Sequence, residues 1–238
     1  AGKKVIAAGP GNPPVVVDET AILSKAAKDI VTGASFDNNV LCTAEKEVFV
    51  VEKVANTLKS EMTKNGAVEL KGYQLDKLLG KVLVKKGEKY YPNREFIGKD
   101  ASVLLEAAGI RADSKVKLII AETKEDHPLV HTEMLMPILP IVRVSDVDKA
   151  ISLAVKAEKG NRHTAIMHSQ NVTNLTKMAK EIQATIFVKN GPSVAGLGYQ
   201  SEGFTTLTIA GPTGEGLTSA KTFTRQRRCV LVDGFRII

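Results

Sequence analysis

The chain has very little cysteine and no long hydrophobic run. Two of its 238 residues are cysteine, Cys42 and Cys229, which is too few for the disulfide framework of a small secreted domain. No apolar stretch approaches the roughly 20 residues that a membrane-spanning helix needs. The opening stretch AGKKVIAAGPGNPP is too short and too broken by Gly and Pro for a signal peptide. We therefore expect a reducing, cytoplasmic location and no membrane partner.

A nucleic-acid-binding signature is also lacking, although the charge of the chain would suit one. There are 33 Lys+Arg against 26 Asp+Glu, a formal net charge of +7. These basic residues are scattered, and the dense cluster KTFTRQRR belongs to no recognisable helix-turn-helix, zinc-finger or RNA-binding pattern. We expect no nucleic-acid partner, because an anionic small ligand or a solvated basic surface accounts for the charge equally well.

Short apolar segments alternate with amphipathic ones along the chain. Strands are predicted at PVVVD, EVFVV, KVKLIIAE, MPILPIVRV, TAIMHS and TIFVKN, and near the two ends at KKVIAA and RRCVLVDGF. Helices are predicted over 20–34 and over EKVANTLKSEMTKNG, YQLDKLLGKVL, DASVLLEAAGI, SDVDKAISLAVKAEKG and NVTNLTKMAKEI. Repeated strand–helix–strand units predict an α/β fold with a mostly parallel sheet flanked by helices.

Cys42 stands between a polar turn and an alternating apolar segment, in GASFDNNVLCTAEKEVFV. A thiol becomes a useful nucleophile when it is accessible and its thiolate is stabilised. Asn38, Asn39 and Thr43 are nearby donors, and backbone N–H groups of such a turn could hold an oxyanion. These residues alone leave two interpretations open, a nucleophile or a small, inert turn residue. Cys229, inside CVLV, is typical of a buried structural thiol.

The histidines are weaker candidates. His163 follows a helix-ending glycine and opens a strand, where polar groups of parallel sheets gather, so it could be an acid–base or orienting group. His168, inside the same strand, is more typical of a packed core residue. His127 and His131, with Glu133, do not make a convincing ligand set, so no metal is predicted. The glycine-rich stretch GPTGEG lacks the features of a phosphate-binding loop and is predicted to be a turn.

Several stretches carry a resemblance in combination. They are GPGNPPVVVDETA, SFDNNVLCTAEKEVFVVE, HTEMLMPILPIVRV, GNRHTAIMHS and FTTLTIAGPTGEGLTSAKTFTRQRRCVLVDGF. In this order they resemble CoA-acylating aldehyde dehydrogenases of the ethanolamine- and propanediol-utilisation type. The resemblance covers essentially the whole chain, but only the C-terminal half of these enzymes, so we expect an aldehyde dehydrogenase catalytic domain.

The resemblance implies roles for four residues. Cys42 occupies the position of the catalytic cysteine, whose thiolate attacks a short aldehyde such as acetaldehyde or propionaldehyde. Hydride then leaves to NAD, and the cysteine thioester passes its acyl group to CoA. Glu133 and Pro137 match the E-x-x-x-P motif, whose glutamate holds the nicotinamide ribose. His163 falls where this branch carries a His-Thr pair near the thioester.

Two departures from the wider family shape these expectations. Ala7 stands near the position of the glutamate that activates water in hydrolytic members. Without that carboxylate water is a poor acceptor, which favours transfer to CoA. The chain also has no G-x-G-x-x-G dinucleotide fingerprint. We therefore expect that it binds neither NAD nor CoA by itself and is inactive alone.

The resemblance also suggests how the chain is divided. Residues 1–9 would be a remnant of the last strand of a dinucleotide-binding domain, and residues 10–221 the catalytic domain. Residues 222–238 would form an oligomerisation strand, of which Arg225 to Val232 joins the sheet of a second copy, making at least a dimer. The chain would be cytoplasmic, and residence inside a bacterial microcompartment stays open. The alternative functions are a basic α/β interaction or assembly module and, less well supported, a cysteine hydrolase.

Overall fold

A seven-stranded sheet forms the centre of the molecule. The computed structural model describes residues 2–234. The strand order is β3-β6-β7-β2-β1-β8-β9, and each neighbouring pair is parallel. In that order the strands are Ala67–Glu69, Leu118–Glu122, Ile138–Val144, Glu47–Val51, Pro14–Val17, Thr164–His168 and Ile186–Lys189. This confirms the predicted α/β class, although the short strand β3 was not predicted.

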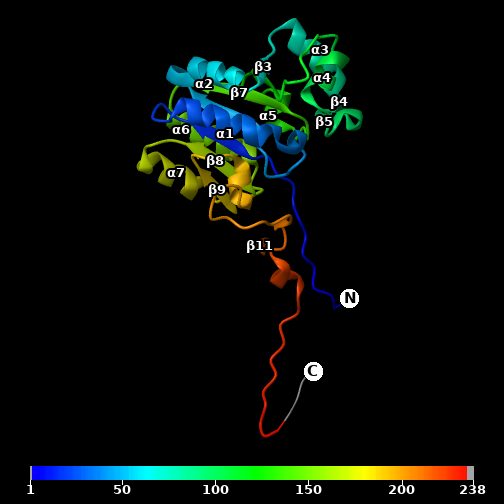
Figure 1. Ribbon diagram of the computed structural model, residues 1–238, viewed down its shortest axis with the longest axis vertical. Helices are drawn as coiled ribbons and strands as arrows, with labels where there is room; N and C mark the ends of the chain where they lie inside the picture. The colour runs from blue at the N-terminus through cyan, green and yellow to red at the C-terminus, as the bar shows by residue number, and fades with distance from the viewer. Residues whose placement is uncertain (1, 235–238) are drawn as a thin grey trace.

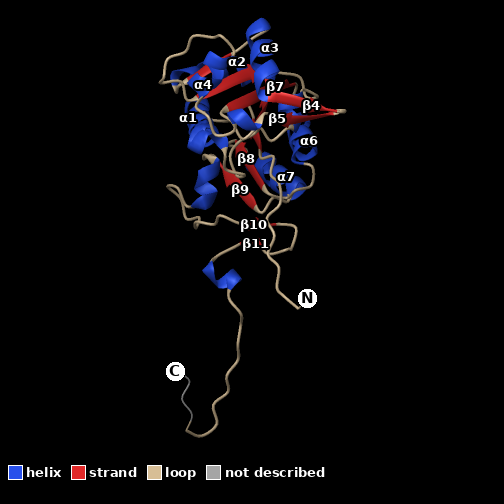
Figure 2. Ribbon diagram, turned by 90° about the vertical axis from the view of Figure 1, so that its right-hand side faces the viewer, coloured by secondary structure: helices blue, strands red, loops and turns tan. Residues whose placement is uncertain are grey.

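Helices cover both faces of this sheet. The main ones are α1 (Leu23–Ser35), α2 (Glu52–Lys64), α6 (Val147–Glu158) and α7 (Val172–Ile182). Val15 and Val17 of β1 pack in one buried cluster with α1 and α2, whereas Val16 packs in another with α6 and α7. Because successive side chains of a strand point to opposite faces, a fully buried strand reads as a continuous apolar run. Figure 2 shows the sheet between α1 on one side and α6 and α7 on the other.

A third buried cluster lies at the β6 end of the sheet. It involves α3 (Tyr73–Val82), α4 (Ala101–Ala107) and α5 (Pro128–His131), which pack against Ile119 and Ala121 of β6. An antiparallel hairpin, β4 (Leu83–Lys86) and β5 (Lys89–Pro92), follows α3 and was not predicted. A second hairpin pairs β10 (Ile209–Ala210) with β11 (Gly216–Leu217), and its turn is the stretch GPTGEG, as expected.

Four short 3₁₀ helices complete the structure. They are η1 (Phe36–Asn39), η2 (Arg94–Phe96), η3 (Ser193–Leu197) and η4 (Ala220–Phe223). No helix within residues 2–234 combines the length and the apolar character needed to span a bilayer.

Both terminal segments differ from the sequence prediction. Lys4–Ala8 is not a strand, and neither is Arg225–Val232; both run as extended coil away from the body (Figure 1). A strand needs a neighbour for its N–H and C=O groups, and neither segment pairs with a strand among residues 2–234. Cys229 is exposed rather than buried. Residue 1 and residues 235–238, part of the two predicted terminal strands, lie outside the described residues.

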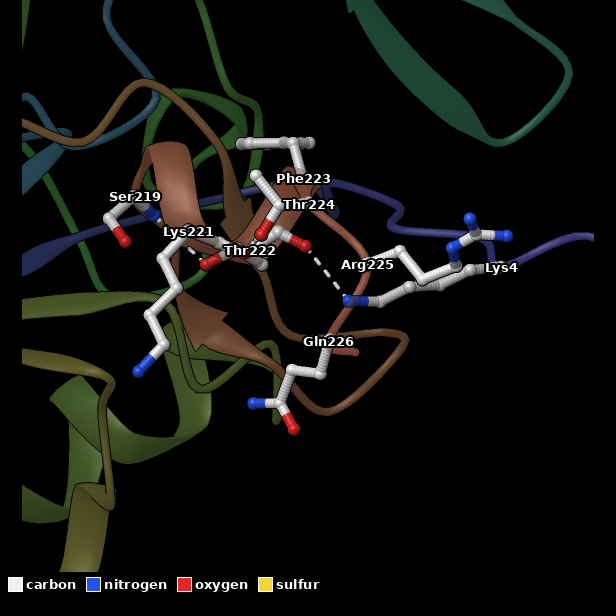
Figure 3. A pocket seen from close by; sticks show the side chains of 8 residues that line it. All are labelled: Lys4, Ser219, Lys221, Thr222, Phe223, Thr224, Arg225 and Gln226. Carbon is white, nitrogen blue, oxygen red and sulfur yellow. Dashed lines mark hydrogen bonds between the residues drawn. The ribbon is translucent and has the colours of Figure 1, made fainter. Parts of the chain in front are cut away.

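The N-terminal segment contacts the chain just ahead of the C-terminal segment. The Lys4 ammonium group donates a hydrogen bond to the Thr222 carbonyl over 2.8 Å, and the Ala7 N–H donates to the Thr213 hydroxyl over 3.2 Å. Figure 3 shows the hollow that Lys4 lines together with Ser219 and residues 221–226. This hollow contains none of the candidate catalytic residues, so we assign it no chemistry.

Candidate active site

Four neighbouring strands bring the candidate residues to one edge of the sheet. β7, β2, β1 and β8 are adjacent and parallel, so the segments that precede them lie side by side. Glu133 precedes β7, Cys42 precedes β2, Gly11 precedes β1 and His163 precedes β8. Open parallel sheets usually bind ligands at the carboxyl ends of their strands. This cluster forms at the amino ends, which corrects the reason given above for choosing His163.

Gly11 separates the cysteine loop from the histidine. A Cβ atom placed on Gly11 would lie 2.6 Å from the Cys42 carbonyl oxygen and 3.2 Å from Cγ of His163. The Cys42 backbone and the His163 ring therefore pack against the same bare glycine. Any larger residue would force the Cys42 backbone to move. Sequence analysis missed this role, although the glycine lies in the stretch GPGNPP.

The turn before Cys42 is conformationally strained. Asp37, Asn38 and Asn39 have successive φ angles of 47°, 50° and 65°, in the left-handed region that residues other than glycine seldom adopt. Such a run persists only where the surroundings hold it.

Two asparagine side chains help to hold this turn. The Asn39 amide donates to the carbonyls of Ala34 (2.8 Å) and Glu45 (2.9 Å). The Asn38 amide donates to the Gly98 carbonyl and, over 2.7 Å, to the Asp100 carboxylate. The suggestion that these amides are donors for a substrate is therefore wrong, because both N–H₂ groups are already used by the fold.

The Cys42 side chain is half-buried, and its environment favours the protonated thiol over the thiolate. Burial raises its pKa above the ordinary value, and the nearby Glu133 charge raises it further. Lys46 and the backbone amides of Cys42 and Thr43 act in the opposite direction. Burial also raises the pKa of the Glu133 carboxyl. Within residues 2–234 this carboxyl has no hydrogen bond or ion pair, so its oxygens are available to hydroxyl donors.

His163 is buried and neutral. Burial and the Lys46 charge lower its pKa to about 4. Its Nδ1 lies 2.9 Å from the Thr164 hydroxyl, and its backbone N–H donates to Glu158. The Nε2 atom has no partner among residues 2–234, and no hydrogen bond there joins the ring to the Cys42 sulfur. The ring is therefore a weak base in this environment, and it is not paired with the thiol in this structure.

The remaining predicted residues have structural roles. Pro137 is buried at the start of β7, and its carbonyl accepts from the Ile119 N–H over 2.9 Å. His168 is a buried core residue of β8, as expected, and burial lowers its pKa to about 3. His127 accepts from the Leu129 N–H through Nδ1 at the start of α5. His131 places Nε2 2.9 Å from a backbone carbonyl. Within the described part of the chain, no three His, Cys, Asp or Glu residues gather as metal ligands.

Two charged residues beside Cys42 were missed. Lys46 is buried, and so is Glu45, whose carboxyl accepts from the Ser193 N–H (2.8 Å) and hydroxyl (2.7 Å). Burial raises the pKa of Glu45 to about 7. A mixed run of charges such as AEKE normally indicates a solvated surface. This run leads into β2, a strand buried on both faces, and that position was the one signal in the sequence that Glu45 and Lys46 are buried.

Comparison with known proteins identifies the family. A family model described as "Aldehyde dehydrogenase family" matches residues 1–205. The chain belongs to the aldehyde dehydrogenase family. It is 56% identical over 237 residues to the propanal dehydrogenase (CoA-propanoylating) of Citrobacter freundii, which covers 99% of this chain and 50% of that protein. It is 52% identical to the acetaldehyde dehydrogenase (acetylating) of Salmonella typhimurium, covering 99% of this chain and 51% of that one.

Solved structures of aldehyde dehydrogenases share its fold. The propionaldehyde dehydrogenase of Rhodopseudomonas palustris, with bound CoA and an acylated cysteine, superposes with a TM-score of 0.92 at 57% identity, over 97% of this chain and 52% of that one. A propionaldehyde dehydrogenase from a fucose-utilisation microcompartment of Clostridium phytofermentans gives 0.90 at 50% identity, over 98% and 53%. The resemblance to the CoA-acylating branch is confirmed, and this aldehyde dehydrogenase chain spans about half the length of these relatives.

Replacing Glu45 by glutamine should change the pH dependence of stability. Because the folded-state pKa is raised from 4.5 to about 7, the stabilisation that depends on this proton is full below pH 4.5 and is lost as pH rises through 7. The wild type should therefore lose about 3 kcal/mol relative to Glu45→Gln between pH 4.5 and 8. Urea unfolding at several pH values measures this difference.

Glu106→Gln, at an exposed position of α4, is the matched control and should show a flat difference over the same range. An equally flat difference for Glu45→Gln would show that folding does not raise the pKa of this carboxyl.

Proposed function

We propose that this chain is the catalytic half of an NAD-dependent aldehyde dehydrogenase that converts a short aldehyde, acetaldehyde or propanal, into its acyl-CoA. The packing of the Cys42 loop and the His163 ring against Gly11, with Glu133 close by, carries the proposal. The names of the relatives, CoA-propanoylating and acetylating, support the reaction and the substrate size.

Cys42 is the nucleophile in this proposal. Its thiol loses a proton, and the sulfur lone pair forms a bond to the aldehyde carbonyl carbon. After oxidation the acyl group remains on Cys42 as a thioester, and Cys42 leaves as a thiolate when a second thiol attacks that carbon. The backbone amides of Cys42 and Thr43 favour the thiolate in both steps. His163, with Nε2 unpartnered among the described residues, serves in this proposal as an auxiliary acid–base or orienting group.

The Glu133 carboxyl suits one of the two cofactors in this proposal, the nicotinamide cofactor. Bound NAD supplies the hydride acceptor, and bound CoA supplies the thiol that takes the acyl group. The half-buried Glu133 carboxyl, which has no donor of its own within residues 2–234, would hold the nicotinamide ribose through its hydroxyls. Pro137 would fix the start of β7 behind it. Ala7, near the family's water-activating glutamate, supports CoA rather than water as the acceptor.

The division of the chain is also part of the proposal. Residues 10–221 act as the catalytic domain, and residues 1–9 connect to a dinucleotide-binding half. Residues 222–238 extend to a second copy of the chain. Within residues 2–234, neither terminal segment pairs with a strand, which supports this arrangement. We place the enzyme in the cytoplasm, and the Clostridium relative makes a microcompartment the narrower location to test.

Activity measurements on the enzyme carrying both halves test the assignment. Cys42→Ala should abolish acyl-CoA formation, because no other group near Gly11 is a thiol. His163→Ala should slow the reaction by roughly 10²–10⁴-fold if the ring transfers protons. Cys229→Ser is the control and should retain full activity. Acyl-CoA production by Cys42→Ala would rule out the proposed nucleophile, and turnover by residues 1–238 alone would contradict the division of the chain.

The tail provides a separate test of assembly. Val230, Leu231 and Val232 are 74%, 53% and 77% exposed, and such a stretch is stabilised by covering it with a second chain. Light scattering should give at least a dimer for the 238-residue chain and a monomer for a chain ending at Ala220. The proposal fails if the intact chain is monomeric, or if the shortened chain still associates.

A further inference from the structure

Lys46 lies at the start of β2 with its ammonium group inside the protein. It is 3% exposed, and its Nζ donates to three oxygens: the Asn39 carbonyl (2.8 Å), the Asn39 side-chain oxygen (2.7 Å) and the Leu41 carbonyl (3.1 Å). An ammonium group has three N–H donors, and burying it is costly unless each has an acceptor. All three acceptors belong to the turn that leads into Cys42.

These contacts hold the strained part of the turn. Asn39 is the last of the three left-handed residues, and Leu41 directly precedes Cys42. Two of the three hydrogen bonds end on Asn39 and the third on Leu41, so one side chain spans the segment from the strained residues to the thiol. Without it, the buried Asn39 carbonyl would lose its donor, the Leu41 carbonyl would keep only the Ala44 N–H, and the left-handed run would lose part of what holds it.

Lys46 is also the cation of a site that is otherwise acidic. Burial lowers its pKa to about 8, which leaves it charged at neutral pH. The charges of Cys42, Glu45, Glu47 and Glu133 raise the pKa of Lys46, and the Lys46 charge lowers the pKa of His163. Cys42 and Glu45 precede β2, Glu47 begins it, Glu133 lies in the α5–β7 loop and His163 directly precedes β8. Glu133 opposes ionisation of the thiol, and Lys46 favours it. The same ammonium group therefore acts on both the position and the charge of the thiol.

We propose that Lys46 is the positioning residue of Cys42, holding its turn through three hydrogen bonds and serving as the counter-ion of the thiolate. The inference rests on the proposed role of Cys42 as nucleophile. It predicts that the charge of Lys46, and not only its packing, controls the reactivity of the thiol.

The test is the rate of Cys42 alkylation in the 238-residue chain carrying Cys229→Ser. Iodoacetamide reports the thiolate fraction at each pH. Lys46→Arg keeps the charge, Lys46→Gln keeps hydrogen-bond donors without charge, and Lys46→Met removes both. Lys53→Met, at an exposed position of α2, is the matched control.

Lys46 is charged at pH 7 and loses its proton at about pH 8, below the range in which the Cys42 thiol, with its raised pKa, ionises. The variants are therefore compared at pH 7, where Lys46→Gln and Lys46→Met should slow alkylation roughly tenfold, whereas Lys46→Arg and Lys53→Met should retain the wild-type rate. A purely structural lysine would leave the pH 7 rate of Lys46→Gln at the wild-type value, and that result would overturn the proposal. If Lys46→Met fails to fold, the comparison of Lys46→Gln with Lys46→Arg decides by itself.

This test is independent of turnover. A wild-type alkylation rate at pH 7 in Lys46→Gln refutes the positioning role even if the enzyme forms acyl-CoA through Cys42. Conversely, acyl-CoA formation by a Cys42→Ala enzyme would refute the proposed function. That result would leave the alkylation measurements, made on chains that retain Cys42, unaffected.

Discussion

The parallel register of the central strands determines where every group of the site lies. Val48 of β2 pairs with Val15 of β1 and with Ile141 of β7, and Val15 pairs with Ile166 of β8. The segments before these strands are thereby brought to the same edge of the sheet. A shift by one residue would exchange the two buried faces of a strand, so the register is strongly specified by packing. Because core packing fixes the register of β2, it also fixes the position of the loop that carries Cys42.

Burial of charge is the second constraint on this edge. Glu47 is fully buried and its pKa is raised well above the usual range, while Lys46 and His163 have lowered pKa values. The largest cause of each shift is the cost of placing charge away from water. The site is consequently less charged than its composition implies. The raised pKa of Cys42 keeps its thiol protonated when no ligand is bound.

The sheet and its four main helices could be predicted because their apolar periodicity is local. The family could also be predicted, since the motifs around Cys42, Glu133 and His163 follow one another in a specific order. The terminal strands could not. The apolar stretch CVLV has the same pattern whether or not a neighbouring strand is present, so the prediction that Cys229 is buried was wrong.

Parts of the site were also beyond sequence reasoning. Gly11 is important because two segments distant in sequence meet at it, and Lys46 because its acceptors are backbone carbonyls. Neither contact leaves a mark in composition or periodicity. The amides of Asn38 and Asn39 were taken as donors for chemistry because their partners, which lie within the fold, could not be seen in the sequence.

The most direct test of the central claim is the site of acylation in the enzyme carrying both halves. Thioester exchange with propanoyl-CoA transfers the acyl group to the nucleophilic thiol and releases free CoA, without any net oxidation or reduction. Peptide mass spectrometry should find the propanoyl group on Cys42, and excess CoA should remove it. Acylation confined to Cys229 or to lysines, or a Cys42→Ala enzyme that is acylated to the same extent, would contradict the account.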